Sequence, residues 1–329
     1  MLDGGQPYKA CTLRSERNVK SASWFSSSAL TQLFDLSPSQ TTVPNHILSV
    51  DLEDYFHVEA FADVVDRSNW AQYPSRIESN THRLLDLFDE FQARATFFVL
   101  GWVAERHPTL IREIVMRGHE PACHSYWHRL IYTLTPEEFG EDTRRSKHVI
   151  EQAGGMVVTG YRAPSFSLTS NSLWALDILG EAGFNYDSSI FPIAHDIYGI
   201  PAAPRFPFRI ATASGSLVEY PITTFRLGNS NLPVGGGGYL RILPFWYTRL
   251  GLLCAEREGL PQILYVHPWE IDPDQPRLKG RARSRFRHYT NLKKTYQRLR
   301  FLLGQGKFQS FSGSSLVNAI PSVEFPLVA

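Results

Sequence analysis

Four groups of polar residues in this sequence have the chemical types that bind metals or transfer protons. Carboxylates and imidazoles are the usual protein ligands of zinc and similar divalent ions, and both act as general acids and bases. Each group follows a short apolar stretch typical of a buried strand. The groups are Asp51 with Glu53 and Asp54, His124 with His128, Arg162, and His267.

Three residues separate the two histidines of the second group, a spacing that places both imidazoles on one face of a helical turn. With one carboxylate they would make a three-ligand site with a position left open for water. Each group has a plainer interpretation as well. Residues 51–54 could form a solvated turn, Arg162 a surface ion pair, and His267 a core histidine, and the chain holds 11 histidines. The conjunction of the four groups favours a site.

The elements that would position these groups alternate between strand and helix. Such alternation favours an α/β fold with a parallel sheet, open or closed as a barrel, in which catalytic groups gather at the carboxyl ends of the strands. We therefore expect the four groups to converge. Strands are expected at residues 47–51, 95–100, 119–123, 157–161, 217–220 and 262–266, and helices at 77–91, 108–117, 136–152, 173–182 and 244–258.

Two stretches lack this order. Residues 1–44 are polar and show no sustained periodicity, which predicts a flexible tail. After Ile200 the sequence is rich in proline and contains four consecutive glycines from Gly235 to Gly238, which predicts a long irregular insertion.

Composition sets broad limits. The chain has 329 residues, 43% hydrophobic and 20% charged, so it can bury a sizeable core. A net charge of +1 excludes a global attraction to nucleic acid or membranes. Cys11, Cys123 and Cys254 are too few and too scattered for a disulfide framework. The start lacks the pattern of a secretory signal and no apolar run could span a membrane, so we expect a soluble, cytoplasmic protein, with envelope association as the alternative.

The order of the motifs resembles that of the polysaccharide deacetylases, the chitooligosaccharide-deacetylase-like carbohydrate esterases. The similarity covers about residues 46–275, and residues 50–57 with the glycine-rich 235–241 resemble the subgroup linked to bacterial exopolysaccharide synthesis, which carries its own C-terminal extension. The motifs that carry the resemblance are the acidic group after the first strand, Ala95–Val99, Gly118-His119-Glu120, His124-Ser125-Tyr126-Trp127-His128, Arg162-Ala163-Pro164, Tyr186–Ser189 and Leu264–His267.

This resemblance implies a distorted (β/α) barrel of about seven parallel strands over residues 45–329, in which 201–329 form the subgroup-specific part that supplies the last catalytic histidine. It implies a hydrolase that removes N-acetyl groups from amino sugars. An acetamide is a poor electrophile, so its hydrolysis needs an activated water, a stabilised oxyanion and a proton for the leaving amine.

The resemblance also assigns roles to individual residues. His124, His128 and an acidic residue would hold a divalent metal, with zinc the first choice. Asp51 would be the general base, with Arg162 holding it ionised and oriented. The backbone N–H near Ser165, where the family usually has tyrosine, would help to hold the oxyanion. His267 would be the general acid, oriented by Asp187.

The acidic motif departs from the family, in which the base and the metal carboxylate are adjacent. Here the sequence is Ser49-Val50-Asp51-Leu52-Glu53-Asp54. If the strand continues through Leu52, its period of two places Asp51 and Glu53 on one face; if it breaks at Asp51, Asp54 could take the ligand position. The sequence leaves Glu53 and Asp54 equal as the acidic ligand.

Several further residues are candidates for contact with sugar. Aromatic side chains can stack on pyranose rings, although core packing is the plainer interpretation of each. His57 and Arg241 lie in family-like segments. The candidate substrate-binding residues are Ser165, Phe166, Trp127, Trp269, Arg241 and His57.

Residues 277–300 contain 10 Lys or Arg and no Asp or Glu. An apolar stripe predicts that 291–303 form a helix docked on the body, which leaves the arginines of 281–287 as a candidate anion site. A nucleic-acid role would rest on this stretch alone, and none is expected. The expected partners are an N-acetylated polysaccharide or oligosaccharide and exopolysaccharide synthesis machinery. The alternatives are a small-amide hydrolase on the same barrel and an inactive sugar-binding or scaffold protein.

Overall fold

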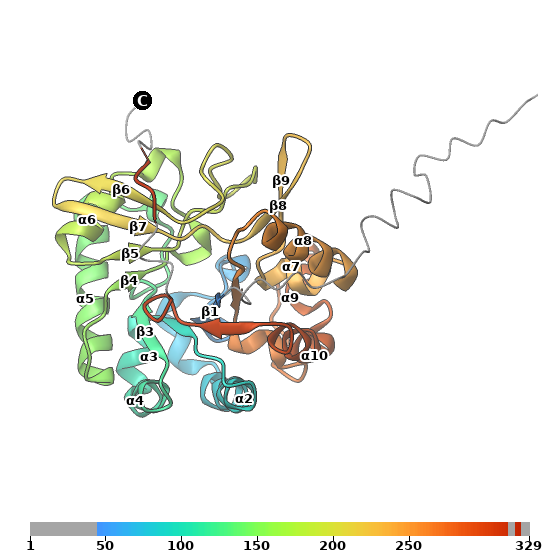
Figure 1. Cartoon of the computed structure of the whole chain (residues 1–329). Helices are drawn as coiled ribbons and strands as arrows, with labels where there is room; N and C mark the ends of the chain where they lie inside the picture. The colour runs from blue at the N-terminus through green and yellow to red at the C-terminus, as the bar shows by residue number, and fades with distance from the viewer. Residues whose placement is uncertain (1–44, 315–319, 324–329) are drawn as a thin grey trace, which may run out of the picture. The chain divides into compact units, whose positions relative to one another are not determined.

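A computed structural model of the chain describes residues 45–314 and 320–323 (Figure 1). Within them, a mainly parallel sheet is surrounded by helices. The predicted N-terminal tail and Cys11 lie outside the described residues.

The main sheet has the strand order β10-β1-β2-β3-β4-β5-β7-β6, and β11 also pairs with β1. The seven strands from β10 to β7 pair in parallel, whereas β6 is antiparallel to β7. The predicted α/β fold with about seven parallel strands is therefore confirmed. The strands are β1 (Asn45–Leu52), β2 (Thr96–Val99), β3 (Glu120–Cys123), β4 (Gly160–Tyr161), β5 (Tyr186–Asp187), β6 (Phe208–Thr212), β7 (Gly215–Glu219), β10 (Ile263–Val266) and β11 (Lys307–Gln309).

Every predicted helix is present, and α10 is the docked helix expected in the basic stretch. The helices α3, α7 and α9 were not predicted, because each is too short to show the repeat of apolar residues that marks a helix in the sequence. The α-helices are α2 (Ile77–Glu90), α3 (Gly101–Arg106), α4 (Pro108–Met116), α5 (Pro136–Gly154), α6 (Ala175–Glu181), α7 (Gly237–Ile242), α8 (Phe245–Arg257), α9 (Ala282–Tyr289) and α10 (Leu292–Leu303). Short 3₁₀ helices occupy Glu59–Phe61, Arg67–Gln72, Ile131–Thr133, Pro164–Phe166, Ser170–Ser172 and Pro268–Ile271.

Helix α5 shows how local sequence fixes these boundaries. Thr135 and Glu138 form a reciprocal capping box at its start, and Pro136 occupies the first turn, where no N–H bond is lost. Gly155 ends the helix with φ of 70°, a left-handed conformation that glycine adopts without strain. These residues set the ends of a helix that packs on α3, α4 and β3.

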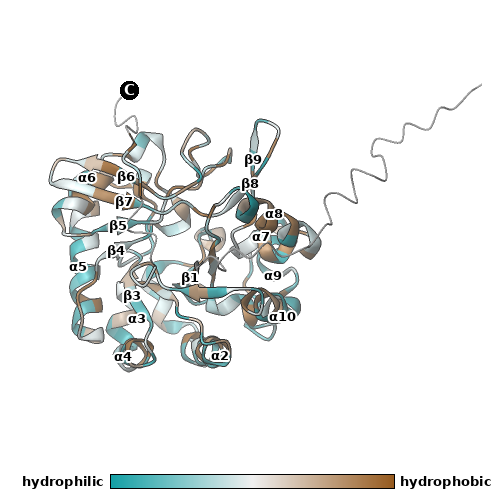
Figure 2. Ribbon diagram, viewed as in Figure 1, coloured by the Kyte–Doolittle hydropathy of each residue, from teal (hydrophilic) through white to brown (hydrophobic). Residues whose placement is uncertain are grey.

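The core lies on both sides of the sheet. Leu48, Val50 and Leu52 of β1 pack in the larger apolar cluster, where the helices meet the sheet. Ile47 points to the opposite face, into a second cluster with Phe98 and residues of other strands. Figure 2 shows the matching pattern on the helices, with apolar and polar residues on different sides of α5 and α10. Because side chains alternate along a strand, Ser49, Asp51 and the following Glu53 share the inner face with Ile47.

The region expected to be an irregular insertion contains two antiparallel hairpins. One is β6–β7, and the other is β8 (Thr224–Leu227) with β9 (Ser230–Pro233). Each turn has two residues, 213–214 and 228–229, and a glycine at positive φ lies in it or next to it, Gly228 at 59° and Gly215 at 143°. In these hairpins the sequence predicted only the strand at 217–220, because the other strands are short and alternate poorly.

The glycine run passes directly against β10. Gly236 forms a parallel bridge with Tyr265, and Tyr265 N–H donates to the carbonyl of Gly235 at 2.9 Å. A Cβ on Gly236, whose φ is 134°, would lie 2.0 Å from the Tyr265 carbonyl oxygen. Only glycine allows the chain to pass this close to β10.

Two expectations from composition concern the described residues. Cys123 and Cys254 are free thiols. None of the described helices combines the length and the apolar character needed to cross a membrane.

Candidate active site

The acidic residues at the end of β1 point in different directions. Asp51 and Glu53 are buried on the inner face of the sheet, as the continued strand predicts. Asp54 instead accepts hydrogen bonds from the backbone N–H groups of Tyr55 and Arg76, at 2.9 and 2.7 Å, and from Ser75 Oγ at 2.8 Å. Its carboxylate is therefore engaged in fixing the following turn, and Glu53 is the residue that faces the histidines.

The two histidines meet Glu53 from a loop after β3. Nε2 of His124 and Nε2 of His128 each lie 3.1 Å from Glu53 Oε1. The sequence spacing suggested a helical turn, but the loop is not helical: Ser125 and His128 have φ of 61° and 52°. These two residues have left-handed backbone conformations, which turn the second imidazole back towards the first. The histidine pair therefore depends on a strained backbone conformation in this loop.

Residues outside the loop hold it in this shape. Arg67 donates to the carbonyl oxygens of Trp127 and His128, at 2.7 and 3.0 Å. Asp142 of α5 accepts from the backbone N–H of Tyr126 at 2.7 Å and more weakly from that of Trp127. The sequence gave no signal for Arg67 or Asp142, because neither lies near a motif.

The three side chains fit a divalent metal ion. Two imidazole nitrogens and one carboxylate oxygen lie within 4.8 Å of one another, and all three side chains are buried. His124 Nδ1 donates to the carbonyl oxygen of Arg162 at 2.8 Å, so a divalent ion would bind at Nε2 in place of the proton that Nε2 directs at Glu53. Burial raises the pKa of Glu53, but the charge of His128 and the hydrogen bonds from both histidines hold it well below its usual value. This donor set is typical of zinc and related ions.

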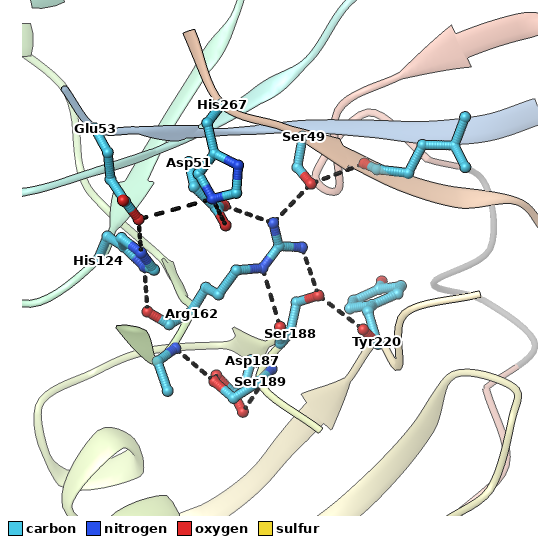
Figure 3. Close-up of polar contacts among 12 residues, drawn as sticks. Ser49, Asp51, Glu53, His124, Arg162, Asp187, Ser188, Ser189, Tyr220 and His267 are labelled. Carbon is cyan, nitrogen blue, oxygen red and sulfur yellow. Dashed lines mark hydrogen bonds and ion pairs between the residues drawn. The ribbon is translucent and has the colours of Figure 1, made fainter. Parts of the chain in front are cut away.

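Arg162 follows β4 and is completely buried beside Asp51 (Figure 3). Its Nη1 lies 2.7 Å from Asp51 Oδ1 and 2.8 Å from Ser49 Oγ. Ser188 accepts from the same guanidinium through its carbonyl oxygen and its Oγ, at 3.1 and 2.9 Å. The guanidinium also lies over the Phe98 ring at 4.1 Å. With this many partners the arginine is fixed, and it fixes the direction of the Asp51 carboxylate.

His267 follows β10 and completes the cluster. Its Nε2 lies 3.7 Å from Asp51 Oδ2 and 3.9 Å from Glu53 Oε1. Its Nδ1 lies 3.1 Å from Oε2 of the buried Glu270, which also accepts from the His267 backbone N–H at 3.0 Å. Arg241 Nε in turn donates to Glu270 Oε1 at 2.6 Å. The order Arg241–Glu270–His267 therefore leads from the protein interior to the cluster.

This arrangement sets the charge of His267. Burial alone would lower the pKa of its imidazole, but the Glu270 charge and contact, helped by Glu53 and Asp51, raise it to about 9. Burial would raise the pKa of Glu270, yet the charges of Arg241 and His267 lower it to about 2. A protonated imidazole is thus favoured next to Asp51, as a general acid requires.

Asp187 does not contact His267 in the structure, contrary to the expectation from the sequence. Its Oδ1 accepts from Ser189 Oγ at 2.5 Å, and burial raises the pKa of its carboxyl and that of Glu219 beside it on β7. Ser189 Oγ in turn lies 2.8 Å from Ala163 N. Asp187 therefore supports the loop after Arg162. Glu270 takes the place expected for it, and its signal was its spacing of three residues from His267.

The predicted sugar contacts divide by burial. His57 and Trp269 are each 3% exposed, with His57 packed among Phe56, Trp70 and Trp102 and with Trp269 stacked on His288. Arg241 is also buried, through its bond to Glu270. None of the three presents a surface to a polymer, because each side chain is buried within the protein.

Of the remaining candidates, Phe166 is buried and the other two lie nearer the surface. Ser165 is partly exposed, and Ser165 and Phe166 have φ of 52° and 54°. Trp127 is partly exposed as well. Together with Ser125 and His128, Ser165 and Phe166 make four of the six left-handed non-glycine residues in the described part of the chain. Strained backbone therefore concentrates around the cluster.

The fold and the cluster define an α/β protein whose parallel strands end at two histidines and a carboxylate, with a buried Asp–Arg pair and a third histidine beside them. Comparison with known families agrees with this class. Residues 67–186 match the polysaccharide deacetylase family, and residues 188–315 match a domain of unknown function (DUF3473). Over residues 67–186 the chain is therefore similar to the polysaccharide deacetylase family, which agrees with the resemblance seen in the sequence.

Named relatives are similar over about a third of the chain. A peptidoglycan deacetylase of Helicobacter pylori is 34% identical over 110 residues, which are 33% of this chain and 36% of the relative. A chitooligosaccharide deacetylase of Bradyrhizobium sp. is 30% identical over 100 residues, which are 30% of this chain and 43% of the relative. The chain therefore spans less than half the length of either relative.

A solved structure shows the same fold over most of the chain. It is that of a Mycobacterium smegmatis protein described as a polysaccharide deacetylase, with a TM-score of 0.52, 21% identity, and coverage of 84% of this chain and 91% of that chain.

Proposed function

We propose that the protein is a metal-dependent hydrolase that removes N-acetyl groups from amino sugars of a bacterial exopolysaccharide or its precursor and releases acetate. The observation that carries this proposal is the convergence of three sequence-distant motifs on one carboxylate. Glu53 Oε1 lies within 3.9 Å of a nitrogen from each of His124, His128 and His267. Similarity to the polysaccharide deacetylase family supports the chemistry.

The residues divide the work of amide hydrolysis. A divalent ion held by Glu53, His124 and His128 would polarise an acetyl oxygen and lower the pKa of a bound water. Asp51 accepts the proton of the attacking water, because Arg162 occupies its Oδ1 and leaves Oδ2 directed towards the cluster. His267, held by Glu270, then donates a proton to the leaving amine.

The choice of an exopolysaccharide rests on the resemblance of residues 50–57 and 235–241 to the subgroup linked to exopolysaccharide synthesis. The inactive alternative was motivated by the altered acidic motif. The altered motif still supplies a carboxylate at both histidines, since Glu53 takes the position that the neighbour of Asp51 would hold in the usual motif. This favours a working site over a scaffold.

The test is acetate release from N-acetylglucosamine oligomers by zinc-loaded and chelated protein. Asp51→Asn removes the base and keeps the shape, and His124→Ala removes a ligand. We expect chelation and His124→Ala to abolish release, and Asp51→Asn to slow it by about 10²- to 10⁴-fold.

The matched control is His148→Ala, because His148 is an exposed histidine of α5. It should release acetate at the rate of the wild type. Zinc content and circular dichroism establish that each variant is loaded as expected and folded. Release that survives both chelation and the two site substitutions would contradict the proposal.

A further inference from the structure

Helix α9 carries an unusual set of exposed charges. Arg283, Arg285 and Arg287 are all exposed, and among the described residues none of the three has an ion-pair partner. Arg281, just before the helix, pairs with Asp63 at 3.2 Å. Unpaired arginines on one short helix leave a positive surface that an external anion can satisfy.

The end of α9 is bound to the same residues that position His267. Arg241, which donates to Glu270, also donates through Nη1 to the carbonyl oxygens of Arg287 and His288, at 2.6 and 2.8 Å. The His288 ring stacks on Trp269 with centroids 4.1 Å apart. The helix is therefore fixed to the wall of the active site, next to α7 (Figure 1).

A loop formed by residues 195–199 lies beside the site. Tyr198 of this loop and Tyr239 of α7 are joined by a hydrogen bond between their hydroxyls, at 2.7 Å. Burial lowers the pKa of His195 in the same loop. The charge of Asp196 opposes this shift, and the charges of Arg287 and Arg283 add to it.

The same loop forms one side of a pocket. The pocket has a volume of about 450 Å³, and its other side comes from residues just after Phe166. The Phe166 ring lies 6.1 Å from that of Tyr198, so the pocket adjoins the segment expected to hold the oxyanion. The lining residues are Tyr132, Thr169, Asn171, His195, Asp196, Ile197, Tyr198 and Gly199.

We propose that Arg283 and Arg287 form a binding site for an anionic group of the glycan, a carboxylate or a phosphate carried near the N-acetylated sugar. The inference rests on the proposed function and narrows its substrate to acidic glycans. Guanidinium groups pair well with either anion, and such pairs select charge without taking part in the chemistry. Asp196 lies at the rim of the pocket, where its negative charge reduces the positive potential.

The test measures glycan binding by calorimetry, in full-length protein with Asp51→Asn so that sugar is not consumed. The carboxylate probe is a hyaluronan hexasaccharide, compared with its carboxyl methyl ester, which has the same linkages and no charge. The phosphate probe is N-acetylated chitotriose 1-phosphate, compared with N-acetylated chitotriose. We expect tighter binding of at least one charged probe and a smaller difference at high salt.

Two charge-matched variants separate the site from general attraction. The double variant Arg283→Gln with Arg287→Gln should weaken binding of the charged probe by about 3- to 30-fold and leave binding of its neutral partner unchanged. Arg112→Gln with Arg144→Gln removes two exposed arginines of α4 and α5 and should change neither. Asp196→Asn should strengthen charged binding.

Equal binding of charged and neutral probes would overturn the inference, as would equal losses in the two double variants. Binding only to vesicles of anionic lipid would also overturn it and would indicate a membrane surface. The charged probes could bind more tightly than their neutral partners while the zinc-loaded wild type releases no acetate from any glycan. That result would refute the proposed hydrolase and still support the anion site.

Discussion

At the scale of single residues, the site is a set of buried charges in which each has a partner. Arg162 faces Asp51, Glu53 faces two histidines, and Glu270 lies between Arg241 and His267. An isolated buried charge would cost several kcal/mol, and here the opposite charge of each partner offsets the cost of burying the group. Removing one charge should therefore change the protonation of its neighbour as well as the packing.

Glu270→Gln tests this dependence. The folded pKa of His267, about 9, lies above the ordinary value of 6.5, so the Glu270 contact stabilises the fold below pH 6.5, and this stabilisation is lost as pH rises through 9. Glutamine keeps the shape and removes the charge, so the pKa of His267 should fall. Because the acid must be protonated, we expect the alkaline limb of kcat/KM to move to lower pH in the zinc-loaded variant.

The comparison for this variant is Glu141→Gln, on the exposed side of α5. It should leave the alkaline limb in place. An unchanged limb in Glu270→Gln would mean that Glu270 does not set the protonation of His267.

At the scale of elements, strand ends bring the motifs together and tight turns aim them. Asp51, His124, Arg162 and His267 follow or end β1, β3, β4 and β10, which lie close together in the parallel sheet, with only β2 between β1 and β3. The loop that holds Arg162 depends on a neighbouring element pair, β5 and β7, whose paired residues Asp187 and Glu219 are both acidic. Two buried carboxyl groups side by side cannot both be charged at low cost.

Glu219→Gln tests the pair. Burial and the nearby Asp187 raise the pKa of Glu219 well above its usual 4.5, so the folded chain binds a proton that the unfolded chain has released. Stability should therefore fall as pH rises above 4.5, until the folded pKa is passed. Glutamine keeps an acceptor for Ile190 N–H and carries no charge. We expect a melting temperature that depends less on pH between 5 and 8 and is higher than that of the wild type at pH 8.

The control is Glu137→Gln, an exposed substitution near the start of α5 that should not flatten the pH dependence. A melting temperature of Glu219→Gln that follows the wild type at every pH would show that Glu219 is charged in the folded protein.

At the scale of the whole molecule, the C-terminal region completes a site that begins at residue 49. His267 and Glu270 come from β10 and the turn after it, and β11 pairs with β1 near its start. Phe311, just beyond β11, is buried in the inner cluster against Phe98 and Tyr186. The two regions matched to different families therefore share one sheet and one core.

Phe311→Ala measures this shared core. Truncating a buried phenylalanine should lower the free energy of unfolding by about 3–5 kcal/mol, through lost burial and the cavity that remains. Urea denaturation of Phe311→Ala and of Phe286→Ala gives the comparison, since Phe286 is 63% exposed and its loss should change stability by less than about 0.5 kcal/mol. Similar small losses in both would show that the C-terminal region packs independently.

Metal binding should stabilise the whole fold, because the three donors meet only in the folded chain. At free zinc 100-fold above its Kd, the stabilisation is about 2.7 kcal/mol, which thermal melting detects. We expect zinc to raise the melting temperature of the wild type and of His148→Ala, a chelator to reverse the rise, and His128→Ala to show no rise. An equal rise in all three proteins would mean that zinc binds elsewhere.

The sequence by itself determined the resemblance to the polysaccharide deacetylases, the main alternation of strands and helices and the candidate residues of the cluster, because these depend on local periodicity and on motif residues. It could not decide between Glu53 and Asp54, since the choice depends on whether β1 continues through Leu52 and on backbone N–H groups near residue 76. It also placed Asp187 beside His267, where only the structure shows Glu270.

The hairpins after residue 206 and the pairing of α9 with Arg241 were likewise decided by tertiary structure. Short strands and a polar helix carry little periodic signal, and contacts between residues 46 apart follow from packing. The proposed chemistry can thus be inferred from the motifs of this sequence. The residues that set the protonation state of each site residue are brought into contact only when the sheet joins distant segments.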